Sequence, residues 1–135
     1  MAEETSTVNE WLAGLGDLSL DEHGCCGLAA ESGREFLLEV DPADGIFRLM
    51  TPIVTLPASQ RNRFYARVLR INSNQHVLAG AALALDEEHG EISLCHTLMV
   101  EDYNADSFAV LLAEFETRAA FIATALHEAQ TATTS

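Results

Sequence analysis

Residues 83–94 read LALDEEHGEISL and contain the pattern that decides the fold of this chain. Apolar residues alternate with other residues on both sides of the turn segment 86–90. This arrangement predicts two antiparallel strands joined by a hairpin turn. Residues 18–28 read LSLDEHGCCGL and repeat the same Leu-x-Leu-Asp-Glu run before a His-Gly pair. We therefore predict two hairpin turns, with Gly24 and Gly90 in the positive-φ conformation that glycine adopts readily.

The hydrophobic periodicity of the whole chain predicts three helices and five strands. A capping box, Thr7-x-x-Glu10, begins a short first helix. Pro57 opens a second helix that ends near Asn72, and Asn104 caps a long third one. The strands are expected at residues 25–30, 36–40, 46–54, 76–86 and 91–100. The sequence therefore predicts an α+β fold, with an antiparallel sheet of about five strands and the order α-β-β-β-α-β-β-α.

The size of the chain, 135 residues with 48% hydrophobic content, is typical of one globular domain. We expect a single domain over residues 1–135, with flexible ends at 1–6 and 129–135. The first residues lack the basic and apolar regions of a secretory signal, and no apolar stretch is long enough to span a membrane. Three cysteines suit a reducing compartment. These features predict a cytosolic protein.

The charge of the chain is strongly negative. Asp and Glu number 21 against seven basic residues, and the formal net charge is -14. A nucleic-acid-binding domain gains affinity by neutralising phosphates with basic side chains, so this balance argues against a nucleic acid partner. Four arginines fall on the predicted second helix, where neighbouring carboxylates or an acidic partner segment would pair with them.

The run 21–26 contains five side chains that can bind a metal, among them Cys25 and Cys26. Adjacent residues of a strand point to opposite faces, and the spacing matches no zinc motif. The same geometry applies to Cys95 and His96, which in another arrangement could serve as nucleophile and base. We therefore predict no metal, no cofactor and no catalytic residue.

Five stretches of this sequence, taken in order, resemble the class I type III secretion chaperones, the Tir-chaperone (CesT) family. The stretches are WLAGLGDLSLDEHGCCGL, LLEVD followed by IFRLMTPIVTLP, RFYARVLRIN, LAGAALALDEEHGEISLCHTL and DSFAVLLAEFETRAAF. The resemblance covers about residues 8–126. The family pattern does not require the cysteine pair 25–26, and nothing in the sequence explains the absence of lysine.

The resemblance implies an acidic homodimer in the bacterial cytoplasm. Such a dimer binds the N-terminal chaperone-binding segment of one or more secreted effectors in extended form and keeps them soluble and ready for export. The family has no enzymatic activity and does not hydrolyse ATP, because unfolding at export belongs to the secretion ATPase, a further candidate partner. No membrane partner is implied.

The resemblance also implies two sets of site residues. In the family, effector side chains enter pockets beside the first helix and on the sheet, and each residue in these places can equally be ordinary core. The effector-binding candidates here are Trp11, Leu12, Leu15, Leu18, Leu20, Leu28, Phe36 and Leu38. The dimer contact of the family, formed by the middle helix and the fourth strand, falls on Phe64, Val68, Ile71, Val77, Ala79, Ala81, Leu83 and Leu85.

Two alternatives remain open at this point. One is a regulatory protein of the secretion system that uses the same surface to sequester another cytosolic protein. The other is a small ligand-binding or enzymatic α+β domain that uses Cys95 and His96, which would require a pocket and a perturbed thiol.

Overall fold

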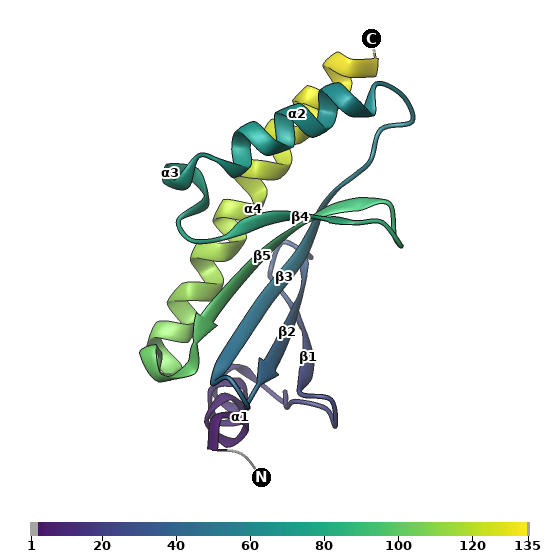
Figure 1. Cartoon of the computed structure of the whole chain (residues 1–135). Helices are drawn as coiled ribbons and strands as arrows, with labels where there is room; N and C mark the ends of the chain where they lie inside the picture. The colour runs from purple at the N-terminus through teal and green to yellow at the C-terminus, as the bar shows by residue number, and fades with distance from the viewer. Residues whose placement is uncertain (1–2, 135) are drawn as a thin grey trace. The chain divides into compact units, whose positions relative to one another are not determined.

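The computed structural model describes the backbone of residues 3–134 and the side chains of residues 3–127 (Figure 1). Its elements are α1 Glu3–Leu15, β1 Cys25–Ala29, β2 Glu35–Asp41, β3 Ile46–Thr55, α2 Arg61–Asn72, α3 Gln75–Leu78, β4 Ala82–Asp86, β5 Glu91–Met99, the 3-10 helix η1 Val100–Asp102, and α4 Ala105–Thr134. The structure confirms the α+β class and the order of the predicted elements. It adds two short helices, α3 and η1, to the three that the sequence predicts.

The five strands form one sheet in the order β1-β2-β3-β5-β4. The pairs β1 with β2, β2 with β3 and β4 with β5 are antiparallel, as predicted. β1 and β4 are therefore the two edge strands, and one side of each has no neighbouring strand.

The contacts of the chain divide it into two compact units. The first unit comprises Met1–Met50 and His96–Glu116, and the second comprises Thr51–Cys95 and Thr117–Ser135. β3, β5 and α4 each continue from one unit into the other. The assignment of residues 1–135 to one domain stays a prediction.

An aromatic cluster forms the core of the first unit. The ring of Phe47, on β3, packs edge to face against Trp11 of α1, with 5.5 Å between centroids, and against Phe108 of α4, with 5.8 Å. Trp11 and Phe108 are themselves 5.0 Å apart, and Tyr103 lies 5.4 Å from Phe47. Each such pair contributes about 0.5–1.5 kcal/mol beyond the burial of its area. These contacts hold α1 and the first part of α4 on the sheet.

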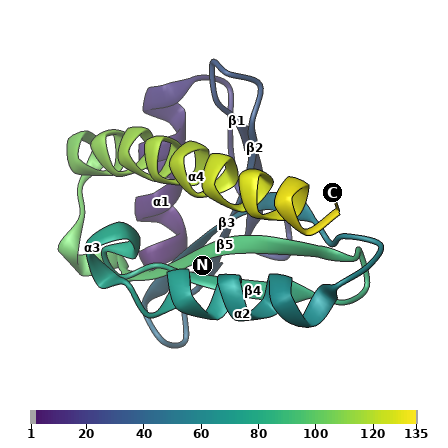
Figure 2. The same cartoon turned by 90° about the horizontal axis from the view of Figure 1, so that it is seen from above.

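In the second unit, α2 lies along β4 (Figure 2). Phe64 and Val68, one helical turn apart, are buried, whereas the four arginines of α2 are exposed. This is the amphipathic pattern that the sequence predicts. The other large buried residues of this unit are Leu78, Leu83, Ile92, Leu94, Ile122 and Leu126.

Two predicted helix starts are wrong. α1 begins at Glu3, so the Thr7-x-x-Glu10 motif lies inside the helix; acidic residues in the first turn favour the earlier start because the helix dipole is positive there. α2 begins at Arg61 and not at Pro57. The residue before it, Gln60, has a left-handed backbone with φ 55°, and the Pro57 carbonyl accepts a hydrogen bond from Arg61 Nε at 2.9 Å.

The predicted strand over residues 76–86 is shorter than expected. Residues 75–78 form the helix α3, and β4 begins only at Ala82. The Asn74 side chain caps α3 by accepting a hydrogen bond from the His76 N–H at 3.2 Å, and Ala79 ends it with a left-handed φ of 47°. Local capping therefore outweighs the apolar run that favoured a strand.

Asn104 caps α4 as the sequence predicts. Its Oδ1 accepts a hydrogen bond from the Ser107 N–H at 2.9 Å, and Ser107 Oγ accepts one from the Asn104 N–H at 2.9 Å. This exchange satisfies two backbone donors at the helix start. Within the described residues, no helix is both long and apolar enough to cross a membrane.

The expected flexible ends fall partly outside the described residues, at residues 1, 2 and 135. Residues 3–6 and 129–134 are helical. A helical backbone does not measure motion, so the flexibility of 1–6 and 129–135 stays a prediction.

Candidate functional site

Within the segment 18–28, residues 21–24 form a tight turn that leads into β1. Asp21 Oδ1 accepts hydrogen bonds from the N–H groups of Cys25 at 2.9 Å and His23 at 2.8 Å, and these two donors lower the pKa of Asp21. Gly24 has the predicted positive φ, 77°. Residues 18–20 do not form a strand, so the prediction of a hairpin here is wrong. The Asp21 carboxylate accepts the hydrogen bond from the Cys25 N–H that the carbonyl of a neighbouring strand would otherwise accept.

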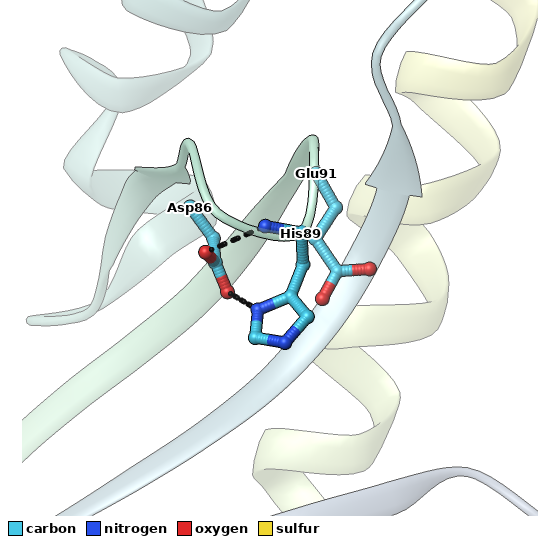
Figure 3. Close-up of side chains that lie close together, drawn as sticks. All are labelled: Asp86, His89 and Glu91. Atoms are coloured by element: carbon cyan, nitrogen blue, oxygen red, sulfur yellow. Dashed lines mark hydrogen bonds and ion pairs between the residues drawn. The ribbon is translucent and has the colours of Figure 1, made fainter.

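The second copy of the motif is the predicted hairpin between β4 and β5. Gly90 has a φ of 62°, and Asp86 pairs with Glu91 across the turn. Asp86 accepts a hydrogen bond from the His89 N–H at 3.1 Å, and its second oxygen lies 2.8 Å from His89 Nδ1 (Figure 3). Ligand atoms of Asp86, His89 and Glu91 lie within 4.8 Å of one another, close enough to hold a cation. The contacts between His89 and Asp86 stabilise the turn and explain why these side chains lie close together without requiring a bound cation.

The pair Asp86 and His89 makes the stability of this turn depend on pH. Their hydrogen bond raises the pKa of His89 and lowers that of Asp86. The His89 contribution is complete below the unfolded value of 6.5 and is lost as the pH rises through the folded value, whereas the Asp86 contribution is complete above 3.8 and is lost as the pH falls. His89→Asn should therefore lower the melting temperature more at about pH 5.5 than at about pH 8.5.

The control is an Asp86→Asn background, in which the effect of His89→Asn should differ much less between the two pH values, since only the weaker influence of Glu88 and Glu91 on the His89 pKa is left. If His89→Asn alone lowers the melting temperature equally at both pH values, the Asp86–His89 pair makes no pH-dependent contribution to stability.

The thiols of Cys25 and Cys26 lie where the thiolate form is disfavoured. Burial, together with the nearby carboxylate of Asp21, raises the pKa of the Cys25 and Cys26 thiols. A raised pKa leaves less thiolate, which is the form that binds metals and attacks substrates. Cys95 and His96 are half-buried at consecutive positions of β5, so their side chains leave the strand in opposite directions.

Among the described residues, the β1 edge has two consecutive outward positions whose N–H groups make no hydrogen bond. The Gly24 carbonyl accepts a hydrogen bond from the Val40 N–H, and the Ala30 N–H donates to the Arg34 carbonyl. Backbone groups alternate in direction along an antiparallel strand, so residues 26 and 28 also face β2, and residues 25, 27 and 29 face outward.

Only the first of these outward residues is closed. The Cys25 N–H donates to Asp21 Oδ1, and its carbonyl accepts a hydrogen bond from the Asp21 N–H at 2.8 Å. Gly27 and Ala29 are exposed, and in the described part of the chain their N–H groups make no hydrogen bond. The Gly27 carbonyl accepts only a weak bond from the neighbouring Cys26 Sγ, at 3.5 Å. An extended segment could therefore add to the sheet along these two residues.

An apolar row crosses the outer face of the sheet next to this edge. Gly27 pairs with Leu37, and Leu37 pairs with Met50, so the three residues lie side by side on neighbouring strands. The Leu37 side chain is 40% exposed, and a Cβ at Gly27 would meet no atom within 4 Å. On the next row, Arg48 forms an ion pair with Glu39 at 3.0 Å. We call Gly27, Ala29, Leu37 and Met50 the β1-edge site.

The predicted effector-binding residues divide between core and surface. Five of them, Trp11, Leu12, Leu28, Phe36 and Leu38, are buried in the first unit. Leu15 is 44% exposed at the end of α1, and Leu18 and Leu20 are half-buried in the segment that leads to β1. Their contact with an effector stays a prediction.

The sequence analysis did not single out the members of the β1-edge site. The available signal was Leu37, a large apolar residue at a position of β2 where alternation calls for a polar one. Gly27 and Ala29 carry no such signal. They belong to the site because their backbone N–H and carbonyl groups point away from β2, and the residue type does not indicate this direction.

The predicted dimer residues divide in the same way. Phe64, Val68, Ala81 and Leu83 are buried within the chain, and the remaining four, Ile71, Val77, Ala79 and Leu85, are half-buried or exposed. Leu69, which the prediction did not name, is 66% exposed on α2. The dimer interface also stays a prediction.

A hollow of about 490 Å³ lies in the first unit, between the start of α1 and the turn from β2 to β3. Carboxylates from Glu3, Glu4, Asp44 and Glu101 line it, with Tyr103 beside them. Such a lining suits a cation better than an apolar side chain.

The fold and this site define a small α+β binding module with an open sheet edge. Residues 12–122 match the Tir chaperone protein (CesT) family, and the chain belongs to this family. The family predicted from the sequence is confirmed. Among curated proteins, none matches this sequence significantly.

Solved structures of secretion chaperone complexes share the fold. The crystal structure of the ExsC-ExsE complex has a TM-score of 0.78 and 22% identity, with 93% of this chain and 97% of that chain covered. The Yersinia pestis type III secretion chaperone SycH, in complex with a stable fragment of YscM2, has a TM-score of 0.65 and 16% identity over 87% and 98% of the two chains. The heterodimeric ExoU-SpcU complex of the Pseudomonas aeruginosa type III secretion system gives 0.64 and 21% over 88% and 93%. At these identities the similarity establishes the fold.

Proposed function

We propose that this chain is a type III secretion chaperone that binds the N-terminal segment of one or more secreted effectors in extended form. It acts in the bacterial cytoplasm as a homodimer and keeps its effector soluble and ready for export. It does so by binding alone, without catalysis. The secretion ATPase is the partner to which the complex would be delivered.

The observation that carries this proposal is the open edge of β1. Two consecutive outward residues, Gly27 and Ala29, can each exchange two hydrogen bonds with an added strand, whose N–H would replace the weak Cys26 Sγ contact at the Gly27 carbonyl. Their side chains are small, so an incoming backbone meets no obstruction, and Leu37 and Met50 offer apolar contact beside it. Main-chain bonds supply affinity in this mode of binding, and the pockets for alternate side chains supply specificity.

Membership of the CesT family supports the choice of an effector as partner. Three similar structures are complexes: ExsC-ExsE, SycH with a YscM2 fragment, and ExoU-SpcU. A regulatory protein that sequesters a cytosolic partner would use the same contacts, and the identity of the captured segment separates the two roles.

The first experiment is to co-express the chain with N-terminal segments of candidate effectors. Gel filtration coupled to light scattering gives the mass of the complex, and limited proteolysis shows whether the segment is protected. We expect a dimer of about twice the 14.6 kDa chain mass that carries a protected segment. A monomer that binds no segment would contradict the proposal. A rapid reaction of Cys95 with thiol reagents would then favour the enzymatic alternative.

A further inference from the structure

The outward backbone groups of β4, the second sheet edge, are closed at successive positions. Just before the strand, the Ala81 N–H donates to the Leu78 carbonyl at 3.0 Å. Two residues further on, the Leu83 N–H donates to Asn72 Oδ1 at 2.9 Å, and Asn72 Nδ2 donates to the Leu83 carbonyl at 3.3 Å. Because direction alternates along the strand, Leu85 is the next residue whose backbone groups point outward.

The Asn72 side chain takes the place of a neighbouring strand residue. A side-chain amide offers one acceptor and two donors, so it can satisfy the N–H and the carbonyl of one strand residue together. Asn72 is half-buried at the end of α2, and α2 lies along β4, so the helix holds the amide beside this edge (Figure 2). An added strand would need the two groups of Leu83 that Asn72 already occupies.

We propose that Asn72 closes the β4 edge and so restricts strand addition to β1. At β4, the remaining outward residue Leu85 stands alone beside the acidic turn 86–88, and charge at an edge discourages pairing. At β1, by contrast, Gly27 and Ala29 are open in succession. Each chain then takes up one extended segment. The identity of that segment rests on the proposed function, whereas the closure of β4 does not.

The hydrogen bonds between Asn72 and Leu83 also limit how a second copy of the chain can pack against α2 and β4. Since Asn72 occupies the backbone of Leu83, two copies that meet at α2 and β4 do so through side chains such as Leu69 and Leu85. They do not form one continuous sheet through this edge.

The test is the variant Asn72→Ala, with Asn62→Ala as the matched control because Asn62 is an exposed asparagine on the same helix. Hydrogen exchange followed by NMR should show the Leu83 amide exchanging up to about tenfold faster in Asn72→Ala. Light scattering should show a mass that rises with concentration above that of the unsubstituted protein. Asn62→Ala should match the unsubstituted protein in both measurements.

A second substitution shows whether the new association uses this edge. Proline at an outward position of an edge strand removes a free N–H without breaking the ladder. Because Leu85 is also a dimer candidate, the reference is Leu85→Pro alone, and Asn72→Ala combined with Leu85→Pro should have the same mass as that single variant at every concentration. If Asn72→Ala does not fold, Asn72→Leu replaces it, since it keeps a side chain of similar size, removes both the donor and the acceptor, and is expected to associate in the same way.

Two results would overturn the proposal. One is an unchanged mass for the folded Asn72 variant at all concentrations, and the other is a mass for the double variant that still exceeds that of Leu85→Pro alone. Neither measurement involves an effector, so failure here leaves the proposed function untouched. Conversely, a chain that binds no effector segment can still show the closed edge.

Discussion

Gly27→Pro is expected to abolish most of the binding of an effector segment while the chaperone stays folded. The N–H of Gly27 points away from β2, so proline removes an outward donor and no bond of the sheet. The proline ring also occupies the space through which an added strand would approach. The variant loses the bond from the residue 27 N–H and, because the ring keeps the added strand at a distance, the bond to the residue 27 carbonyl. Loss of these two hydrogen bonds corresponds to roughly 1–3 kcal/mol, or about a ten- to hundredfold weaker complex. Isothermal titration with the captured segment measures this difference.

The matched control is Gly27→Ala, which keeps the N–H. A Cβ at this position meets no atom within 4 Å, so alanine fits the folded chain. Gly27→Ala should bind within a fewfold of the unsubstituted protein, and both variants should unfold within about 1 kcal/mol of it. Unchanged binding by a folded Gly27→Pro would place the effector elsewhere on the chaperone and remove the observation that carries the proposed function.

Local patterns in the sequence predict most of the elements, because each depends on residues close together in the chain. The hairpin at 83–94 and the Asn104 cap are examples, and both are confirmed. The segment 76–78 shows the limit of this reasoning. His-Val-Leu suits a strand by its composition, but the Asn74 side chain and the left-handed Ala79 enclose it in one helical turn.

The candidate site could be predicted only in part. It depends on the direction in which side chains and backbone groups point, and on hydrogen-bond partners that are far apart in the sequence. Alternation separates Phe36 and Leu38 from Leu37, but it does not say which face becomes covered by helices. Nothing near Asn72 in the sequence indicates that its amide meets Leu83, 11 residues away. The open groups of Gly27 and Ala29 follow from the register of β1 with β2, which the sequence alone does not specify.

Trp11→Ala is expected to destabilise the fold rather than to remove only a binding contact. Trp11 was predicted from the family as an effector contact, yet it is 4% exposed and packs against Phe47 and Phe108. Truncation of such an aromatic residue costs about 3–5 kcal/mol. The total stability of a domain of this size is about 5–15 kcal/mol, so a large fraction would be lost. Urea unfolding followed by far-UV circular dichroism is the suitable measurement, because Trp11 is the sole tryptophan of the chain.

Leu15→Ala, on the same helix, distinguishes an effect on the stability of the fold from an effect on effector binding. Leu15 is 44% exposed, so its truncation should change the free energy of unfolding by no more than about 0.5 kcal/mol. If α1 contributes to the effector surface, the same variant should weaken binding. If Trp11→Ala unfolds at the same urea concentration as the unsubstituted protein but binds poorly, the effector contacts Trp11 itself. That outcome would require α1 to move away from the sheet when the segment binds.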